Sequence, residues 1–169
     1  MKIHSSEQSN SAISLRPVQL DDAPFLLEVY ASTRASEMAL VPWNDEQRDS
    51  FVSSQFAAQQ SYYAQKYPQA DHSLILVQGR AVGSLYLARL KDQLRIADIT
   101  ILPEDRNAGI GSYLLKELRD EASSTGKPLL IYVETFNPSM RLFERLGFQP
   151  IEEQGTHLLM QWSPTARQT

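Results

Sequence analysis

The sequence predicts an α/β fold of the α+β type, in which helices cover both faces of a mixed, mainly antiparallel central sheet. Short apolar runs alternate with longer stretches whose apolar residues recur every three or four positions, and these patterns are typical of strands and helices. Several neighbouring apolar runs are separated by only a few turn residues, which indicates hairpins and hence antiparallel pairing. Together the runs predict a sheet of about seven strands.

The expected helices have recognisable ends. The first opens at residues 21–24 (Asp-Asp-Ala-Pro), because acidic residues and proline are both favoured in a first turn. The second ends before Pro68, and the third ends at residues 126–128 (Gly-Lys-Pro). The fourth has Asn137 as its expected N-cap and Gly147 just past its end. The expected bounds of the last three helices are residues 45–66, 109–123 and 137–146.

Turn residues separate the expected strands. Residues 78–80 (Gln-Gly-Arg), residues 91–93 (Lys-Asp-Gln) and Gly155 each lie between two apolar runs, which indicates hairpins. Pro103 ends the strand before the third helix, because proline has no N–H to donate to a sheet. The expected strands are residues 13–17, 73–77, 81–89, 94–102, 129–133, 148–152 and 158–162.

The length of 169 residues favours a single domain, which we expect over residues 12–162. Residues 1–11 and 163–169 are polar and are expected to be tails, the first of them disordered. No apolar segment approaches the roughly 20 residues that span a bilayer, and the N-terminus lacks the apolar core of a secretion signal. We therefore expect a cytoplasmic location and no membrane partner.

The composition excludes several kinds of chemistry. The chain has no cysteine, which rules out disulfides, thiolate metal sites and a cysteine nucleophile. His4, His72 and His157 lack the spacing of metal ligands, so no metal site is expected. Lys and Arg number 16 against 20 Asp and Glu, a net charge of −4, which argues against a nucleic-acid partner.

The segment between the strand at residues 94–102 and the third helix has the chemistry of an anion site. It reads Arg106-Asn107-Ala108-Gly109-Ile110-Gly111, and its two glycines let backbone N–H groups converge without a Cβ in the way. Those N–H groups lie at a helix N-terminus, where the helix dipole favours an anion such as a pyrophosphate. Alternatively, the glycines merely permit a tight turn from strand to helix.

Two motifs resemble those of the GCN5-related N-acetyltransferase (GNAT) superfamily. The first, Arg106-x-x-Gly109-x-Gly111, is similar to the family's Q/R-x-x-G-x-G/A acyl-CoA signature. The second is the strand at residues 129–134 followed by residues 137–148, which resembles the family's N-x-x-A-x-x-L-Y-x-x-x-G-F block. The expected order of elements also matches this family over nearly the whole folded unit.

The resemblance implies that acetyl-CoA is the acyl donor. It implies a sheet that splays between residues 94–102 and 129–134, where the acyl arm would enter. The end of the first of these strands would pair with the pantetheine arm like an added strand. The implied cofactor-binding residues are Thr100, Ile101, Leu102, Arg106, Asn107, Ala108, Gly109, Ile110, Gly111, Ser112 and Asn137.

One position departs from the family pattern. The tyrosine of the family block, a common general acid for the leaving thiolate, is replaced by Phe143, whose phenyl ring has no proton to donate. Tyr113, Tyr132, Tyr86 or a water is then the alternative donor. A thiolate can also leave unassisted, because the pKa of a free thiol is only about 8.5.

Three carboxylates are candidates for the base that removes a proton from an amine acceptor. Asp98 lies within an apolar strand, where a carboxylate needs either a partner or a purpose. Glu134 ends the next strand, and Glu37 lies in the expected loop between the first two helices. Alternatively, Asp98 is a buried ion-pair partner of Arg95, Arg89 or Arg16.

These features predict an N-acetyltransferase that transfers an acetyl group from acetyl-CoA to a primary amine by direct transfer in a ternary complex. A cysteinyl acyl-enzyme is excluded because the chain has no cysteine. The expected acceptor is a small-molecule or peptide amine. The alternatives are an acyl-CoA-binding regulatory module with little catalysis and an interaction domain without a cofactor. The apolar loop at residues 38–43 is either a pocket wall or a subunit contact, and the second interpretation predicts a homodimer.

Overall fold

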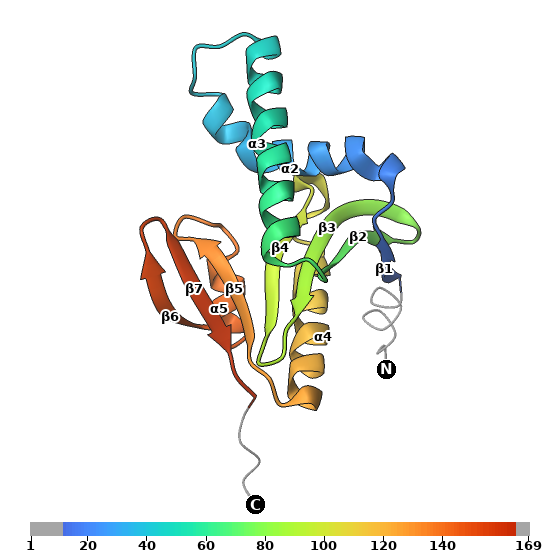
Figure 1. Cartoon of the computed structure of the whole chain (residues 1–169), viewed down its shortest axis with the longest axis vertical. Helices are drawn as coiled ribbons and strands as arrows, with labels where there is room; N and C mark the ends of the chain where they lie inside the picture. Colours follow the sequence, from blue (N-terminus) through green and yellow to red (C-terminus); the bar gives the residue numbers. More distant parts are fainter. Residues whose placement is uncertain (1–11, 165–169) are drawn as a thin grey trace, which may run out of the picture. The chain divides into compact units, whose positions relative to one another are not determined.

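The structure, a computed structural model, describes residues 12–164. Its elements follow one another in the predicted order, and Figure 1 shows their course. The expected tail at residues 1–11 lies outside the described residues, and so do residues 165–169 of the expected tail at residues 163–169. The strands are β1 (Ile13–Pro17), β2 (Asp71–Val77), β3 (Arg80–Arg89), β4 (Leu94–Ile101), β5 (Leu129–Glu134), β6 (Gln149–Gln154) and β7 (His157–Trp162). The helices are η1 (Leu20–Asp22), α2 (Ala23–Met38), α3 (Asp45–Lys66), η2 (Pro103–Asp105), α4 (Ile110–Thr125) and α5 (Met140–Arg145), η1 and η2 being short 3₁₀ turns. Within residues 12–164, no helix is both long enough and apolar enough to cross a membrane.

The predicted fold class is confirmed, because the strands of the described chain form a seven-stranded sheet in the order β1-β2-β3-β4-β5-β7-β6. The pairs β1–β2, β5–β7 and β6–β7 are antiparallel, whereas β4 and β5 are parallel. The described residues divide into two compact units. Unit 1 comprises residues 12–86 and 99–106, and unit 2 comprises residues 87–98 and 107–164. β3 and β4 therefore contribute residues to both units.

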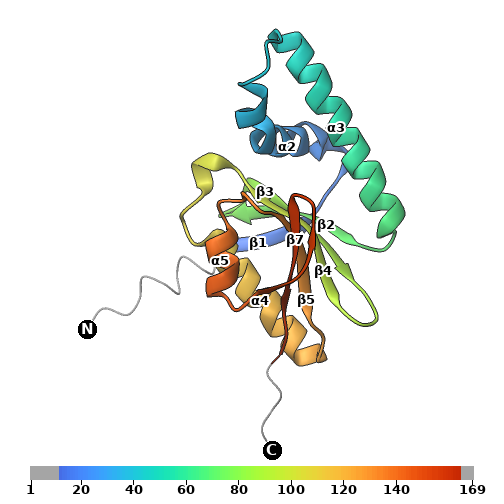
Figure 2. The same ribbon diagram turned by 90° about the vertical axis from the view of Figure 1, so that its left-hand side faces the viewer.

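Unit 1 contains a helical layer formed by α2 and α3, which Figure 2 shows packed together. α2 buries Val29 and Tyr30, and the ring of Tyr30 lies 5.6 Å from the ring of Phe56 on α3. α3 begins where the sequence predicts because it has a capping box. The Gln47 N–H donates to the Asn44 side chain at 2.8 Å, and the Asn44 N–H donates to the Gln47 side chain at 3.0 Å.

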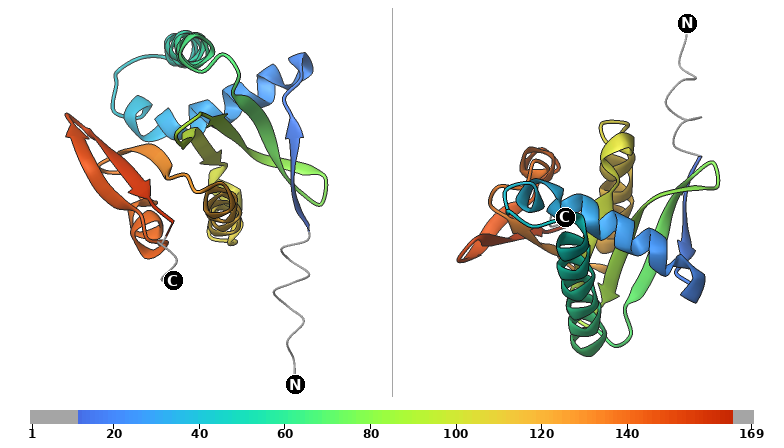
Figure 3. Two further views of the ribbon diagram at one scale, coloured as in Figure 1. Left: turned by 60° about the horizontal axis from the view of Figure 1, so that its bottom comes forward. Right: turned by 90° about the horizontal axis from the view of Figure 1, so that it is seen from above.

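Unit 2 is built around α4 and β5, which are in contact. The apolar side of α4 is buried, as its four-residue spacing predicts, and β5 buries Leu129, Ile131 and Val133. α5 lies against the β6–β7 hairpin, as Figure 3 shows, and the ring of Phe143 meets the ring of Phe148 edge-on at 5.7 Å. This core fixes the start of α4 relative to β5.

The predicted splay between the two central strands is visible in the pairing of β4 with β5. Their parallel ladder joins residues 94–96 to residues 129–131 and ends there, although β5 continues to Glu134. On its other edge β5 pairs with β7 over its whole length. The pairing thus ends at Ile96 and Ile131, at the point along the strands where the sequence predicts the entry of an acyl arm.

The last helix differs from its predicted form. It begins at Met140, and Asn137 is not its N-cap. The Asn137 Oδ1 accepts a hydrogen bond of 2.8 Å from the Ser139 N–H, and the Asn137 N–H donates to the Glu134 carbonyl at 2.9 Å. A side-chain turn of this kind competes with helix formation, so α5 starts only after the turn is complete.

Gly83 lies within β3 and faces the backbone of β4 at close range. A Cβ at this position would overlap the Thr100 carbonyl oxygen and lie 3.0 Å from the Ile101 Cα. We expect Gly83→Ala to lower the free energy of unfolding by about 3 kcal/mol, because backbone atoms must move to admit the methyl group. Urea denaturation measures this loss. Ser84→Ala, in the same buried strand, adds no atom and is the control; an equal loss in both variants would contradict the steric explanation.

Candidate functional site

The anion site predicted from the two glycines has the geometry of an open helix N-terminus. Gly109 is the N-cap of α4, and its φ of 80° is a left-handed conformation that glycine adopts readily. The space where its Cβ would lie is open, with no atom within 4 Å. The Gly109 carbonyl accepts the Tyr113 N–H at 3.0 Å, which closes the first turn. The N–H groups before that bond have no acceptor within the helix, and they belong to Ile110, Gly111 and Ser112.

The turn that leads into α4 is exposed and tightly wound. Asn107 also has a positive φ, 63°, and residues 106–109 are all exposed. Successive backbone N–H groups in such turns form concavities that bind anions. The dipole of α4 adds positive potential at the same place. The turn can therefore hold a negatively charged group through its backbone alone.

Arg106 is held against the end of β4. Its Nε donates a hydrogen bond of 2.9 Å to the Ile101 carbonyl, and its side chain stays exposed. The neighbouring turn η2 is braced by Asp105, which accepts hydrogen bonds of 2.9 and 3.3 Å from Arg80 of β3. The guanidinium of Arg106 thus has a defined direction along the strand end, which a solvated side chain would lack.

Successive backbone N–H groups at the end of β4 point to opposite edges of the strand. The Leu102 N–H donates to the Val82 carbonyl at 2.8 Å, so this group is used by β3. Because alternate residues of a strand direct their N–H groups to opposite edges, the Ile101 N–H points away from β3. Thr100 and Ile101 are half-buried and the Leu102 side chain is buried, so any contact of Leu102 with a ligand would involve its backbone.

The candidate carboxylates lie on two strands and one helix. Asp98 is half-buried in β4, and Glu134 is exposed at the end of β5 with its Oε1 3.9 Å from the His157 Nε2. Glu37 lies in the last turn of α2 rather than in a loop, because α2 is longer than expected, and it accepts a hydrogen bond of 3.1 Å from Arg34. Asp98 and Glu134 therefore share unit 2, whereas Glu37 belongs to a local ion pair of unit 1.

Two arginines that were expected as alternative partners of Asp98 bind other carboxylates. Arg16 donates two hydrogen bonds of 3.0 Å to Asp22, and these bonds hold the pKa of Asp22 below its usual range. Arg89 binds Glu121 of α4 through hydrogen bonds of 2.8 and 3.0 Å. These pairs fasten the start of α2 to β1 in unit 1 and α4 to β3 in unit 2.

The aromatic candidates for proton donation differ in their surroundings. Phe143, at the family's tyrosine position, is only 3% exposed and packs in the core of unit 2. Tyr113 on α4 and Tyr132 on β5 are half-buried in the same unit. Tyr86 lies in unit 1, and burial raises the pKa of its phenol. The structure therefore keeps a hydroxyl available on α4 and on β5, but not at position 143.

The histidines of the described residues occupy different surroundings. His157 is exposed at the start of β7, whereas His72 is half-buried on β2 with its ring 4.6 Å from the ring of Tyr86. His4 lies outside the described residues. Within residues 12–164, no three or more His, Asp or Glu side chains are grouped as a metal ion would require.

Gly83 and Arg95 make structural contacts that were not assigned to them from the sequence. Gly83 has a sequence signal, because a glycine inside an apolar strand indicates a close approach of another backbone. Arg95 has none: its guanidinium lies 5.3 Å from the ring centre of Tyr132, and that contact depends on the register of β4 and β5. Register between distant strands is a tertiary property that local patterns do not encode.

Comparison with known proteins finds one matching family model and several solved structures of similar fold. Residues 69–150 match the family model of the acetyltransferase (GNAT) domain, and no curated protein sequence shows significant similarity to the chain. Among solved structures, PaiA N-acetyltransferase from Thermoplasma acidophilum in complex with coenzyme A is 17% identical, with a TM-score of 0.68 over 89% of this chain and 98% of its own. An acetyltransferase from Thermus thermophilus is 19% identical, with a TM-score of 0.63 and coverages of 90% and 97%. The ribosomal-protein-S18-alanine N-acetyltransferase from Escherichia coli is 17% identical, with a TM-score of 0.61 and coverages of 91% and 96%.

The resemblance carried by the two sequence motifs is thereby confirmed. At these low identities the solved structures establish the fold, and the family model matches the part of the chain that contains both motifs. The chain has the fold of these acetyltransferases, and its residues 69–150 match the model of the GNAT acetyltransferase domain.

His72 should make the stability of the protein sensitive to pH. Burial lowers the pKa of its imidazole from the ordinary value of 6.5, so the unfolded chain takes up a proton at a higher pH than the folded one. The free energy of unfolding should therefore fall as the pH is lowered from about 7.5 through 6.5 toward the folded pKa. Urea denaturation at several pH values measures this slope.

His72→Phe keeps a ring against Tyr86 but has no proton to bind, so its slope should be shallower over the same pH range. His157→Gln, at an exposed position, is the control and should keep the slope of the unmodified protein. An unchanged slope in His72→Phe would show that another group is responsible.

Proposed function

We propose that the protein is an N-acetyltransferase that moves an acetyl group from acetyl-CoA to a primary amine, directly and within a ternary complex. The observation that carries the proposal is the left-handed turn at Gly109, which leaves the start of α4 open to an anion within the acyl-CoA signature. The GNAT domain match supports the same chemistry, and the Thermoplasma protein of this fold was solved in complex with coenzyme A.

The segment from Thr100 to Ser112 fits coenzyme A in its donors and its open space. The first backbone N–H groups of α4 would donate to the pyrophosphate, with the exposed turn at Asn107 and Ala108 beside it. Arg106 would add a positive charge. The backbone of residues 100–102 would pair with the pantetheine arm in the manner of an added strand. Asn137 is a further proposed contact, as the family resemblance implies.

Bound acetyl-CoA would supply a thioester carbonyl, at which a C–N bond to the amine forms, the C–S bond breaks, and the amine proton ends on the departing thiol. The chain must then provide a base, because an ammonium of pKa about 10 has no lone pair for attack. Asp98 and Glu134 are the proposed bases, since both lie beyond the last paired residues of the β4–β5 ladder. The rest of catalysis would come from holding the reactants together and from backbone N–H groups that polarise the thioester carbonyl.

Protonation of the leaving thiolate does not need position 143. Tyr113, Tyr132, Tyr86 or a water would serve, and a thiolate with a pKa of about 8.5 is stable enough to leave alone. The burial of Phe143 nevertheless favours a second candidate function, an acyl-CoA-binding module with little catalysis. Turnover separates the two functions, because such a module would bind coenzyme A but release little thiol when amines are added.

Several parts of the proposal rest on the sequence alone. The acceptor is proposed to be a small-molecule or peptide amine, with no nucleic-acid or membrane partner. A cytoplasmic location, a homodimer and a single domain over residues 12–162 stay predictions of the same kind. The effects expected of substitutions at Gly109, Asp98 and Glu134 do not depend on the location, the oligomeric state or the domain bounds.

Gly109→Val should abolish high-affinity binding of coenzyme A, because a branched side chain would fill the open space over the first N–H groups of α4. Isothermal titration calorimetry should show at least a roughly 10-fold weaker affinity. Gly126→Val is a matched control at the other end of the same helix, where φ is 69° and the Cβ position is also open. Both variants bear similar backbone strain, about 1–2 kcal/mol, so equal affinities would remove the phosphate-binding role of Gly109.

Removal of the catalytic base should lower kcat about 100-fold without weakening the binding of acetyl-CoA. If Asp98 is the base, Asp98→Asn should show this loss, and if Glu134 is the base, Glu134→Gln should show it. Thiol release from acetyl-CoA with a panel of amines measures kcat, and calorimetry measures binding. Glu117→Gln, at an exposed position on α4, is the control. Full activity in both carboxylate variants would contradict a carboxylate base and assign the proton to water.

A further inference from the structure

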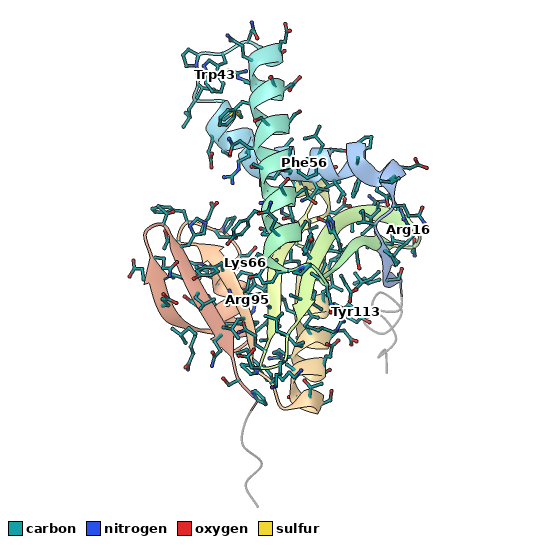
Figure 4. All side chains as sticks on the ribbon, viewed as in Figure 1. Arg16, Trp43, Phe56, Lys66, Arg95 and Tyr113 are labelled. Atoms are coloured by element: carbon teal, nitrogen blue, oxygen red, sulfur yellow. The ribbon has the colours of Figure 1, made fainter. Side chains whose placement is uncertain are left out.

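Arg95 is a cationic side chain whose hydrogen bonding is incomplete. It lies on β4, and Figure 4 labels it there. Its Nε donates a hydrogen bond of 3.1 Å to the side-chain oxygen of Gln93, a neutral acceptor. Its Nη1 is shielded from solvent and has no hydrogen-bond partner among the described residues. A shielded donor of a charged group that lacks a partner is destabilising, so this arrangement needs an explanation.

Other arginines of unit 2 have acceptors for the N–H groups of their guanidinium. Arg89 is neutralised by Glu121, with hydrogen bonds of 2.8 and 3.0 Å. Arg119 lies over the ring of Trp162, 5.9 Å from its centre, and its Nη1 donates to the Leu146 carbonyl at 2.8 Å. Arg95 likewise lies over an aromatic ring, with its guanidinium carbon 5.3 Å from the ring centre of Tyr132, but its Nη1 has no such acceptor among the described residues. A ring face orients a guanidinium and leaves its N–H edge directed elsewhere, which prepares it for a planar anion.

The register of the strands places Arg95 on the same face as a candidate catalytic group. Arg95 pairs with Leu130 on β5, and side chains two residues apart on a strand share a face. Leu130, Tyr132 and Glu134 therefore follow one another along one face of β5, from the buried Leu130 to the exposed Glu134, and Leu129, Ile131 and Val133 lie on the other face. Glu134 lies two residues beyond the ring that orients Arg95, about 6.6 Å along the strand.

We propose that Arg95, oriented by Tyr132, binds a carboxylate on the amine acceptor, and that the acceptor is an ω-amino carboxylate whose amine reaches toward Glu134. This inference rests on the proposed acetyltransferase function and names the class of its acceptor. A carboxylate fits because it is planar and accepts two parallel N–H bonds from a guanidinium. One guanidinium beside the neutral Gln93 and Tyr132 balances one negative charge, which favours a carboxylate over a phosphate dianion. The separation of about two strand residues favours a chain of several carbons between amine and carboxylate.

The test compares acids with their primary amides as acceptors. Thiol release from acetyl-CoA is measured with 4-aminobutyrate, 6-aminohexanoate and the amide of each. The acids should have kcat/KM values about 10- to 100-fold above those of the amides. In Arg95→Met this preference should disappear through a higher KM for the acids, with the amides unchanged. Arg89→Met, which removes a cation from the same unit, is the control and should keep the preference.

The outcomes separate this inference from the proposed function. Equal use of acids and amides by the unmodified protein, or equal losses for both in Arg95→Met, would overturn the carboxylate site while leaving the acetyltransferase intact. Absence of thiol release with every amine, together with no uptake of coenzyme A, would overturn the proposed function. In that event, saturation-transfer NMR of 6-aminohexanoate decides the site on its own: binding that Arg95→Met abolishes supports it, and no difference between the acid and its amide overturns it.

A second, conservative variant tests the proposal if Arg95→Met does not fold. If Arg95→Met fails to fold, as judged by circular dichroism, Arg95→Lys keeps the charge but loses the planar pair of donors. It should lose a large part of the preference for acids and keep the amide rates. An undiminished preference in Arg95→Lys would show that planar recognition by the guanidinium plays no part, and would overturn the proposal.

Discussion

Hydrogen bonding between β4 and β5 stops halfway along β5, and the candidate site depends on that interruption. The ladder ends at Ile96 and Ile131, while the other edge of β5 stays paired with β7 along all of its residues. A strand that is held along one edge keeps its position when its second edge leaves the ladder. The second half of β5 can then stay extended although its edge toward β4 is no longer paired. Asp98 and Glu134, the proposed bases, both lie past the end of the ladder.

Two glycines, Gly83 beside β4 and Gly109 at the start of α4, are needed for the backbone geometry of the candidate site, each for a different reason. Gly83 is required because a Cβ would overlap the backbone of β4 at Thr100. Gly109 has open space around it, and its contribution is a left-handed turn that leaves the first N–H groups of α4 uncovered. One glycine thus admits a neighbouring strand, and the other keeps room for a ligand. A site made of backbone donors needs such positions, because its chemistry is lost when side chains cover it.

The parts of the fold that were predicted correctly are those with local signals. The bounds of α3 were predicted from the helical spacing of its residues and from Pro68 after its end, and the structure adds a capping box of Asn44 and Gln47 at its start. The turn before α4 was predicted because glycine permits the backbone conformations that a tight turn from strand to helix requires, and Gly109 adopts one of them, with a positive φ. The start of α5 was predicted wrongly, because an Asn followed by Pro suits both an N-cap and a side-chain turn. The choice between these depends on the surrounding chain.

Charge at long range and charge at contact select different properties of an acceptor. The chain carries a net charge of −4, so its long-range field disfavours a free anion. At contact, the guanidinium of Arg95, which lies over the ring of Tyr132, would select an anion in the proposed site. An amine that carries its own carboxylate satisfies both conditions, because as a zwitterion it has no net charge and is not repelled as it approaches. Its two charged groups are then distinguished at short range, where screening by salt is weakest. A net negative charge and an arginine oriented for a carboxylate are therefore compatible features of the proposed site for zwitterionic amines.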